Sequence, residues 1–318
     1  MAKPTRIFFV ADLHGSAVCF RKFVNAAKVY QANILIVGGD IAPKTMTPVF
    51  EGSGTWSVTV EGETRTARSI EELERLEGWI RDSATVPFRT TPDVWRELIA
   101  DRTKADAKFQ ELELGELKRW LEWARTRLAG SGARLLLGLG NDDFTSMEGV
   151  IAADGFAELT DGGILRVDDR HELLTLPYSN PTPWHTNREL PEEEIARRVA
   201  ADAGRLEHVE RAIFNLHVPP HNTPLDLAPR LAPGFVKVMA PGGEPELTHV
   251  GSTAVRAALE RFQPMLGLHG HIHESKGSVT IGTTTALNPG SAYTEGTLLG
   301  AVVDLGPDRI RGTMLTSG

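Results

Sequence analysis

The sequence predicts an α/β fold in which polar residues gather at one edge of a parallel sheet. Two runs of apolar, β-branched and aromatic residues, 6–11 and 33–38, each lead into an aspartate, Asp12 and Asp40. Continuous apolar runs of this length are typical of strands that are buried on both faces. Between the two runs, apolar residues recur at helical spacing behind Ser16, a residue type that caps helices. Strand, helix and strand in this order predict parallel pairing, with both aspartates at the carboxyl edge of the sheet.

Later apolar runs repeat this arrangement. Three more strands are expected before polar residues: 134–139 before Asn141, 214–216 before His217, and 265–268 before His271 and His273. Further short strands are expected at 156–159, 164–167 and 172–178, paired antiparallel, and closing strands at 278–282, 298–304 and 309–314. A helix over 191–203 separates the two sets.

The stretch between Asp40 and Asn141 is about a hundred residues long, which is far more than one crossover helix requires. We therefore predict one domain over residues 1–318, with an insertion over residues 45–130. The insertion carries signals for a hairpin and two helices: Thr55–Val60 and Glu63–Ala67 around Glu61-Gly62, a helix after Ser69, and a long helix from Pro92 with a break at Gly115. Because both ends of the insertion are next to expected ligands, we expect it to cap the site or to contact a second subunit in a homo-oligomer. The alternative is that it only extends the core on a side away from these ligands.

Composition bounds the class of protein. The chain has 318 residues and a formal net charge of -8, which argues against nucleic acid as a partner. One cysteine, Cys19, excludes an intramolecular disulfide and fits a reducing compartment. The apolar run before Asp12 is too short for a signal peptide or a membrane span, so we expect a cytoplasmic protein with no membrane contact.

The polar residues at the strand ends are ligand types for transition metals. They are Asp12, His14, Asp40, Asn141, His217, His271 and His273. Asp12 and His14 are two residues apart, so both side chains would point to one side of an extended segment. Carboxylate, amide and imidazole ligands suit Mn, Fe, Zn, Ni or Co, as divalent or mixed-valence ions. Two such ions about 3.5–4 Å apart stabilise the entering and leaving oxygens in phosphoryl transfer.

In order, the motifs are Asp12-Leu-His14, Gly39-Asp40, Gly140-Asn141-Asp142-Asp143, a lone His217 and Gly270-His271-Ile-His273. This set resembles the calcineurin-like metallophosphoesterase superfamily, from residue 7 to residue 291 with the insertion left out. The resemblance implies a two-sheet β-sandwich flanked by helices, and a metal-bridging hydroxide that attacks phosphorus. It also implies that Asp12, His14, Asp40 and His273 hold one ion, and that Asp40, Asn141, His217 and His271 hold the other.

One position departs from the family pattern. The family has histidine after the asparagine, whereas this chain has Asp142, followed by Asp143 at the acidic position. A carboxylate protonates a leaving group only if burial or a neighbouring like charge raises its pKa, and Asp143 could supply that charge. The alternative is that another histidine serves as the acid, with His185 and His221 as the candidates.

We expect a metal-dependent phosphohydrolase, a phosphatase or phosphodiesterase, that cleaves a small phosphorylated substrate, either a phosphomonoester or a small phosphodiester. One alternative is a nuclease of the same superfamily, which the acidic charge disfavours. The other is a metal-binding scaffold with little catalysis. All seven ligand positions are filled, so inactivity would have to arise from Asp142 alone.

Overall fold

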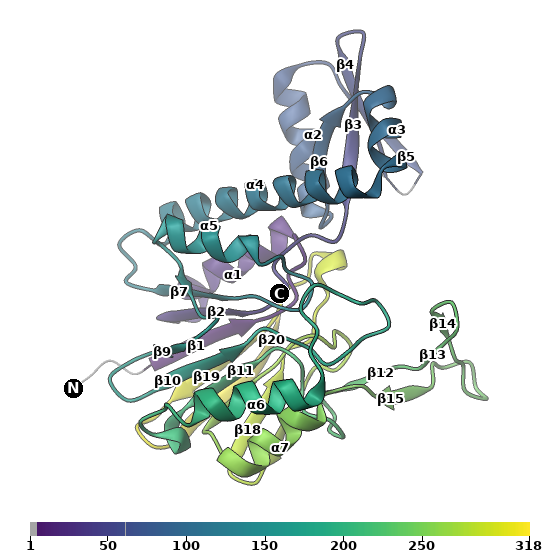
Figure 1. The fold of residues 1–318 in the computed structure, drawn as a ribbon. Helices are drawn as coiled ribbons and strands as arrows, with labels where there is room; N and C mark the ends of the chain where they lie inside the picture. Colours follow the sequence, from purple (N-terminus) through teal and green to yellow (C-terminus); the bar gives the residue numbers. More distant parts are fainter. Residues whose placement is uncertain (1–4, 61) are drawn as a thin grey trace.

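A computed structural model describes residues 5–60 and 62–318, and its main body consists of two six-stranded sheets with helices on their outer sides (Figure 1). The first sheet has the order β20-β19-β1-β2-β7-β8. Its strands are β1 (Thr5–Val10), β2 (Ile34–Gly38), β7 (Arg134–Gly138), β8 (Glu158–Leu159), β19 (Leu299–Leu305) and β20 (Ile310–Ser317). Strands β1, β2, β7 and β8 are parallel neighbours, and β19 and β20 continue the sheet in antiparallel pairing.

The second sheet has the order β17-β18-β16-β11-β10-β9. Its strands are β9 (Ile164–Arg166), β10 (Glu172–Leu176), β11 (Ile213–Leu216), β16 (Leu266–Leu268), β17 (Gly277–Ile281) and β18 (Thr284–Asn288). The four inner strands are parallel, and the two outer strands are antiparallel to their neighbours. The expected antiparallel pairing is therefore correct for β9 and β10 and wrong for β8, which pairs parallel with β7 in the first sheet.

The two sheets share one hydrophobic cluster. Phe9 and Ile36 from the first sheet belong to it together with Leu173, Ile213 and Leu266 from the second. These strands are buried on both faces of their sheets, which explains why they are continuously apolar in the sequence. The edges at which the parallel strands of the two sheets end are consequently held next to each other.

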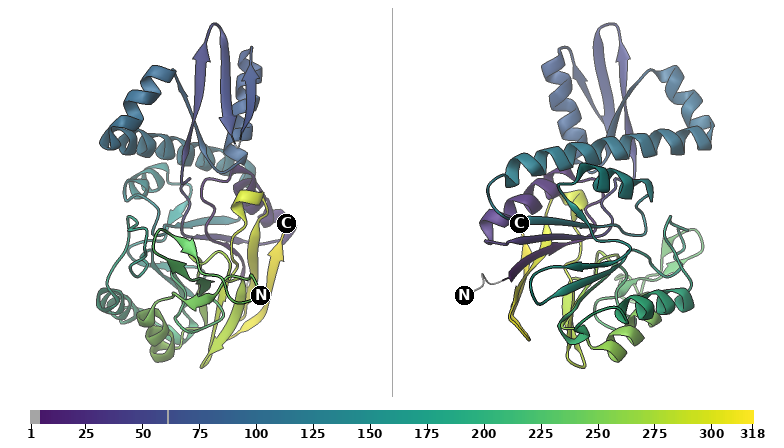
Figure 2. Two further views of the ribbon diagram at one scale, coloured as in Figure 1. Left: turned by 90° about the vertical axis from the view of Figure 1, so that its right-hand side faces the viewer. Right: turned by 60° about the vertical axis from the view of Figure 1, so that its left-hand side comes forward.

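Helices cover the outer faces. Over the first sheet lie α1 (Ala17–Val29), α4 (Arg102–Leu128) and α5 (Ser146–Asp154), and over the second lie α6 (Glu192–Ala203) and α7 (Thr253–Phe262) (Figures 1 and 2). Ser16 caps α1 as predicted, since its hydroxyl accepts from Cys19 N. Two short 3-10 turns, Val209–Arg211 and Tyr293–Glu295, also belong to the main body.

The predicted helix break at Gly115 is wrong. Helix α4 runs through Gly115, and the break lies at Asp101, which ends α3 (Pro92–Ala100) and caps α4 by accepting from Lys104 N. A glycine inside a helix costs only about 1 kcal/mol, and burial of Leu117 and its neighbours on α4 in the body core outweighs this cost.

Residues 46–90 form a separate four-stranded sheet of order β5-β4-β3-β6, with α2 (Ile70–Asp82) packed on it. The strands are β3 (Met46–Gly52), β4 (Thr55–Val60), β5 (Glu63–Ala67) and β6 (Val86–Thr90). The two predicted hairpin strands are confirmed; of the turn between them, Glu61 lies outside the described residues. This module has its own small core and projects beyond α4 (Figure 2).

A second projection was not expected from the sequence. Residues 227–249 form an antiparallel ribbon in which β12 (Leu227–Pro229) pairs with β15 (Leu247–His249), and β13 (Leu231–Ala232) pairs with β14 (Val236–Lys237). The ribbon extends away from the second sheet (Figure 1). Within the described residues, no helix combines the length and the apolar character needed to cross a membrane.

Candidate metal centre

The seven predicted ligands all follow the carboxyl ends of parallel strands. Asp12 and His14 follow β1, Asp40 follows β2, Asn141 follows β7, His217 follows β11, and His271 and His273 follow β16. Because the two sheets share a hydrophobic cluster, these ends meet at one edge. The structure therefore brings together side chains that are up to 261 residues apart, from Asp12 to His273.

The side chains form two groups around Asp40. In the first, the potential ligand atoms of Asp12, His14 and His273 lie within 4.8 Å of one another, and His14 Nε2 is 3.1 Å from His273 Nε2. The second group contains Asp40, His217 and His271 under the same limit. Asp40 Oδ2 lies 3.4 Å from His217 Nε2 and 3.6 Å from His14 Nε2, so this carboxylate stands between the groups.

Asn141 belongs to the second group through its amide oxygen. Oδ1 lies 2.6 Å from His271 Nδ1 and 3.1 Å from His217 Nε2. The orientation of the amide is fixed from the other side, because Nδ2 donates to Thr186 Oγ1 at 2.9 Å. The oxygen is thus the atom presented to the two imidazoles.

The donor set fits transition cations. Burial lowers the pKa of His14 to about 3 and that of His271 to about 4, which favours the neutral imidazole that binds metal. At His217, burial is outweighed by the charges of Asp40 and Asp12, which raise the pKa to about 9, so a cation there would replace a proton. His217 directs Nδ1 to Gly38 O at 3.2 Å, which leaves Nε2 facing Asp40 and Asn141. His14 Nδ1 is buried without a hydrogen-bond partner among the described residues. Such a crowd of buried acceptor atoms is stable only with cations or protons between them.

The backbone at the ligands is left-handed rather than extended. The φ angles are 56° at Asp12, 41° at His14, 52° at Asp40 and 66° at His271. The predicted extended segment for Asp12 and His14 is therefore wrong, although both residues do enter the same group. Their side chains converge because the chain turns sharply after the strand. Gly140 is required here, since a Cβ at that position would collide with the Asp40 carboxylate.

Asp143 ties two ligand loops together. Its carboxylate accepts from Ile41 N at 3.1 Å, Ala42 N at 2.8 Å and Gly140 N at 2.8 Å. Burial and then the charge of Asp40 raise the pKa of Asp143 to about 7. These contacts give Asp143 a positioning role between the loops after β2 and β7.

Asp142 faces the first group and a lysine that the sequence did not single out. Asp142 Oδ2 lies 3.1 Å from Lys44 Nζ and 3.8 Å from His14 Nδ1. Burial, followed by the charge of Asp40, raises the pKa of Asp142. Lys44 lies four residues after Asp40 in a loop without periodicity, so only the fold reveals its place.

Two histidines considered as acids lie in surrounding loops. His185 is exposed and has a left-handed φ of 52° in the loop after β10. His221 is at the base of the ribbon, where its Nδ1 is 3.5 Å from Asp226 Oδ2 and its ring is 5.8 Å from that of His249. The structure thus pairs His221 with Asp226 and His249, outside both ligand groups.

Tyr293 is another residue that sequence reasoning missed. Its ring centroid lies 4.8 Å from that of His14 and 5.7 Å from that of His273, where it packs against the first group. It follows the loop of Ser291, whose hydroxyl donates to Asp12 O at 2.6 Å. No periodic or metal-ligand signal marks a tyrosine in such a loop.

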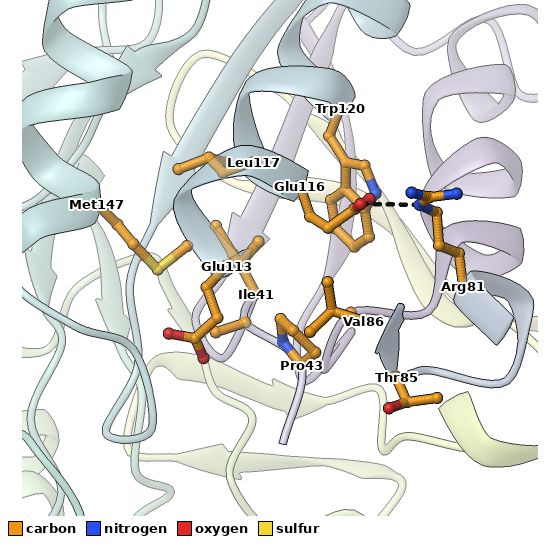
Figure 3. A pocket seen from close by; sticks show the side chains of 12 residues that line it. Ile41, Pro43, Arg81, Thr85, Val86, Glu113, Glu116, Leu117, Trp120 and Met147 are labelled. Carbon is orange, nitrogen blue, oxygen red and sulfur yellow. Dashed lines mark hydrogen bonds and ion pairs between the residues drawn. The ribbon is translucent and has the colours of Figure 1, made fainter. Parts of the chain in front are cut away.

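A narrow pocket lies behind the ligand loops, between α4 and the segment from Ile41 to Pro43 (Figure 3). Glu113 lines it, and its Oε2 has no hydrogen-bond partner among the described residues. Burial, and then the charges of Asp143 and Asp142, raise the pKa of Glu113 to about 9, so this side chain is neutral at pH 7. Further along the same helix, Glu116 Oε1 accepts from Arg81 Nε at 2.8 Å.

Comparison with known proteins supports the fold. No protein-family model matches the chain. The uncharacterized protein MJ1162 of Methanocaldococcus jannaschii is 31% identical over 113 residues, which cover 35% of this chain and less than half, 44%, of that protein. The crystal structure of TT1561 of Thermus thermophilus aligns over 99% of both chains with a TM-score of 0.54 and 12% identity. A second crystal structure aligns over 99% of both chains with a TM-score of 0.56 and 15% identity.

Weaker likenesses include the sulfate thiohydrolase SoxB of Thermus thermophilus, with a TM-score of 0.45, and an archaeal phosphodiesterase, with a TM-score of 0.37. These alignments are too loose to bear on function. The two solved structures align with the whole chain, and the ordered motifs of this chain meet at one edge of its two sheets. The protein therefore shares the fold of these two solved structures along its whole length, which is consistent with the metallophosphoesterase resemblance of its motifs.

Proposed function

We propose that this protein is a binuclear metal-dependent phosphohydrolase, built on a two-sheet β-sandwich, that cleaves a phosphomonoester or a small phosphodiester. The observation that carries the proposal is the position of Asp40. Its Oδ2 lies 3.6 Å from His14 Nε2 in one ligand group and 3.4 Å from His217 Nε2 in the other. A carboxylate between two nitrogen-rich groups is the arrangement that a pair of neighbouring cations requires.

The two ions would divide the ligands between them. One would be held by Asp12, His14, His273 and Asp40, and the other by Asp40, Asn141, His217 and His271. Bound Mn, Fe, Zn, Ni or Co ions would supply Lewis acidity and lower the pKa of a water between them.

The residues around the ligands orient them. Thr186 accepts from Asn141 Nδ2 and so directs Oδ1 inward, and Gly38 O accepts from His217 Nδ1 and so leaves Nε2 free. Both oxygens of Asp12 are within 3.1 Å of His271 N, which ties the loops of the two groups together. The chain therefore sets the geometry before any ligand arrives.

Lys44 supplies the positive charge at the edge of the site. Its ammonium lies against Asp142, and the charges of Asp142 and Asp40 raise the pKa of Lys44 although burial opposes this. A phosphoryl group carries negative oxygens, which an ammonium binds as a point charge. We assign to Lys44 the contact with a phosphoryl oxygen, and to Asp142 the orientation of Lys44.

Hydrolysis of p-nitrophenyl phosphate and bis-p-nitrophenyl phosphate by the purified protein with Mn²⁺ tests this function. We expect at least one ester to be cleaved, with activity lost in EDTA and in Asp40→Asn. Asp304→Asn, in a surface pair with Arg6, is the matched control that keeps activity. Full metal content without hydrolysis of either ester would favour the scaffold alternative. Cleavage of DNA in preference to both esters would favour the nuclease.

A further inference from the structure

Two exposed aromatic rings lie against each other where the loop after β10 meets the ribbon. Trp184, in the loop after β10, and Phe235, in the ribbon, have ring centroids 6.0 Å apart and planes inclined by 16°. They are 61% and 55% exposed. Across residues 5–60 and 62–318, five of the ten exposed large apolar side chains occur in this loop and ribbon: Trp184, Phe235, Val236, Met239 and Leu247. Exposed apolar side chains are thus concentrated in these two elements, and Trp184 and Phe235 are in contact with each other.

The loop that carries Trp184 is anchored on a proposed metal ligand. Thr186 accepts from Asn141 Nδ2 at 2.9 Å, and Glu189 Oε1 accepts from both the backbone and the hydroxyl of Thr186 at 2.8 Å. Trp184 N donates in turn to Thr182 Oγ1 at 3.2 Å. Trp184 is two residues from Thr186, so their Cα atoms are at most about 7 Å apart. The backbone of Trp184, from which the indole extends, is therefore close to the second ligand group.

The ribbon that carries Phe235 is fixed separately. At its base the buried Asp226 accepts from Thr223 N at 2.9 Å, Gly251 N at 3.0 Å and His249 Nδ1 at 2.8 Å. Asn180 Nδ2 donates to Val250 O at 3.3 Å and joins this base to the loop of Trp184. The two rings consequently belong to two elements that are each held in place without the ring contact.

We propose that Trp184 and Phe235 bind a planar aromatic group on the alcohol side of the phosphoester substrate. This inference rests on the proposed function, because it places the phosphoryl group at the metal centre. Because Trp184 and Phe235 are stacked and more than half exposed, a third ring can stack on the outer face of the pair, and such stacking is tolerant of ring identity. Trp184 is two residues along the loop from Thr186, which contacts Asn141. This separation leaves room for a spacer, such as a sugar, between the phosphoryl group and the ring of the substrate.

The test compares two ligands that differ only in the ring: adenosine 5′-monophosphate and ribose 5-phosphate. We expect the wild type to bind the nucleotide about tenfold more tightly by titration calorimetry, and Trp184→Ala to lose this preference. Ribose 5-phosphate affinity should stay unchanged in the variant. Trp184→Phe should keep most of the preference, and Phe235→Ala should lose part of it. Trp95→Ala, which breaks the distant Phe88–Trp95 pair, is the matched control.

The remaining outcomes separate this inference from the proposed function. A nucleotide preference that depends on Trp184, without hydrolysis of any ester, would support the ring surface and reject the hydrolase. Equal affinity of the wild type for both ligands, or equal losses for both in Trp184→Ala, would overturn the inference. A change of subunit number in Trp184→Ala with the preference intact would show that a second copy covers the rings, and would also overturn it. Tighter binding of 1-naphthyl phosphate than of the nucleotide would identify a simple aryl group as the ring.

Discussion

Lys44 and Asp142 form an ion pair in which Nζ lies 3.1 Å from Oδ2, at the edge of the candidate metal centre. Asp142 alone would repel a phosphate ester, because its carboxylate is also 3.8 Å from His14 Nδ1 in the first ligand group. With Lys44 beside it, the pair carries no net charge. The ion pair therefore makes an acidic residue compatible with an anionic substrate at this position.

Replacing Lys44 by methionine tests its contact with the phosphoryl group. We expect KM for p-nitrophenyl phosphate to rise about tenfold or more, since loss of a charged hydrogen bond costs about 1.5–3 kcal/mol. Lys44→Arg should retain most of the affinity, and the double variant Lys44→Met with Asp142→Asn should recover part of it. Metal content should be that of the wild type in all three. An unchanged KM in Lys44→Met would refute the assignment.

The dependence of rate on the leaving group tests the acid. With Asp142 bound to Lys44, we expect a steep fall in kcat from aryl to alkyl phosphates, because an ionised carboxylate has no proton to give. His185→Ala and His221→Ala should leave this slope as it is. A flat dependence, combined with a large loss of kcat in either histidine variant, would show that a distal histidine protonates the leaving group.

Elemental analysis of protein purified without chelator tests the two-ion assignment. We expect close to two transition metal ions per chain in the wild type and fewer than one in Asp40→Asn, because Asp40 contacts both ligand groups. Asp304→Asn should match the wild type. A wild-type stoichiometry near one, or an Asp40→Asn variant with full metal content, would contradict the bridging role.

Glu113 makes stability depend on pH. Its carboxyl has a pKa of about 9 in the folded chain and close to 4.5 when unfolded, so the folded chain alone keeps the proton between these values. The stability that the protonated group contributes is complete below pH 4.5 and is lost as pH rises toward 9.

Glu113→Gln cannot titrate, so its melting temperature relative to the wild type should rise between pH 5 and pH 8.5 by a few degrees. Glu194→Gln is the control. The arginine partners of Glu194 lower its pKa to about 2, so it is ionised throughout this range. A Glu113→Gln difference that stays constant with pH would show that Glu113 is ionised in the folded protein.

Removal of residues 46–84 tests whether the projecting module caps the centre or joins subunits. Its ends are close together, since Val86 N donates to Thr45 O at 3.1 Å, so two glycines can link Thr45 to Thr85. Metal content should be retained because the module has a separate core. If the module is a cap, its removal should raise activity on bulky esters relative to small ones. If it joins subunits, its removal should lower the mass on gel filtration. Unchanged selectivity and mass would exclude both roles.

The sequence predicted the strands, and the side chains that gather at the candidate metal centre, because both depend on local patterns. Apolar runs that stop at Asp12 and Asp40 define β1 and β2, and the hairpin Thr55–Val60 and Glu63–Ala67 was predicted to the residue. The start of a helix could also be predicted where a side chain caps it, as Ser16 caps α1. These features need no knowledge of the rest of the chain.

Features that depend on distant partners could not be read in this way. Lys44 becomes part of the site only because the loop after β2 meets Asp142 after β7. The first turn of α6 places Glu192 where it accepts from Ser252 Oγ and Ala254 N at the start of α7. The ribbon of residues 227–249 has short strands of mixed composition that carry no clear alternation.

The left-handed backbone at four of the proposed ligands restricts how this lineage can change. A β-branched residue is poorly tolerated at Asp12, His14, Asp40 or His271, whereas asparagine and glycine adopt that conformation readily. Descendants that lose metal binding would therefore be expected to carry asparagine or glycine at these positions, rather than valine or isoleucine. Relatives with that signature would mark where in the family tree the chemistry was abandoned while the architecture was inherited.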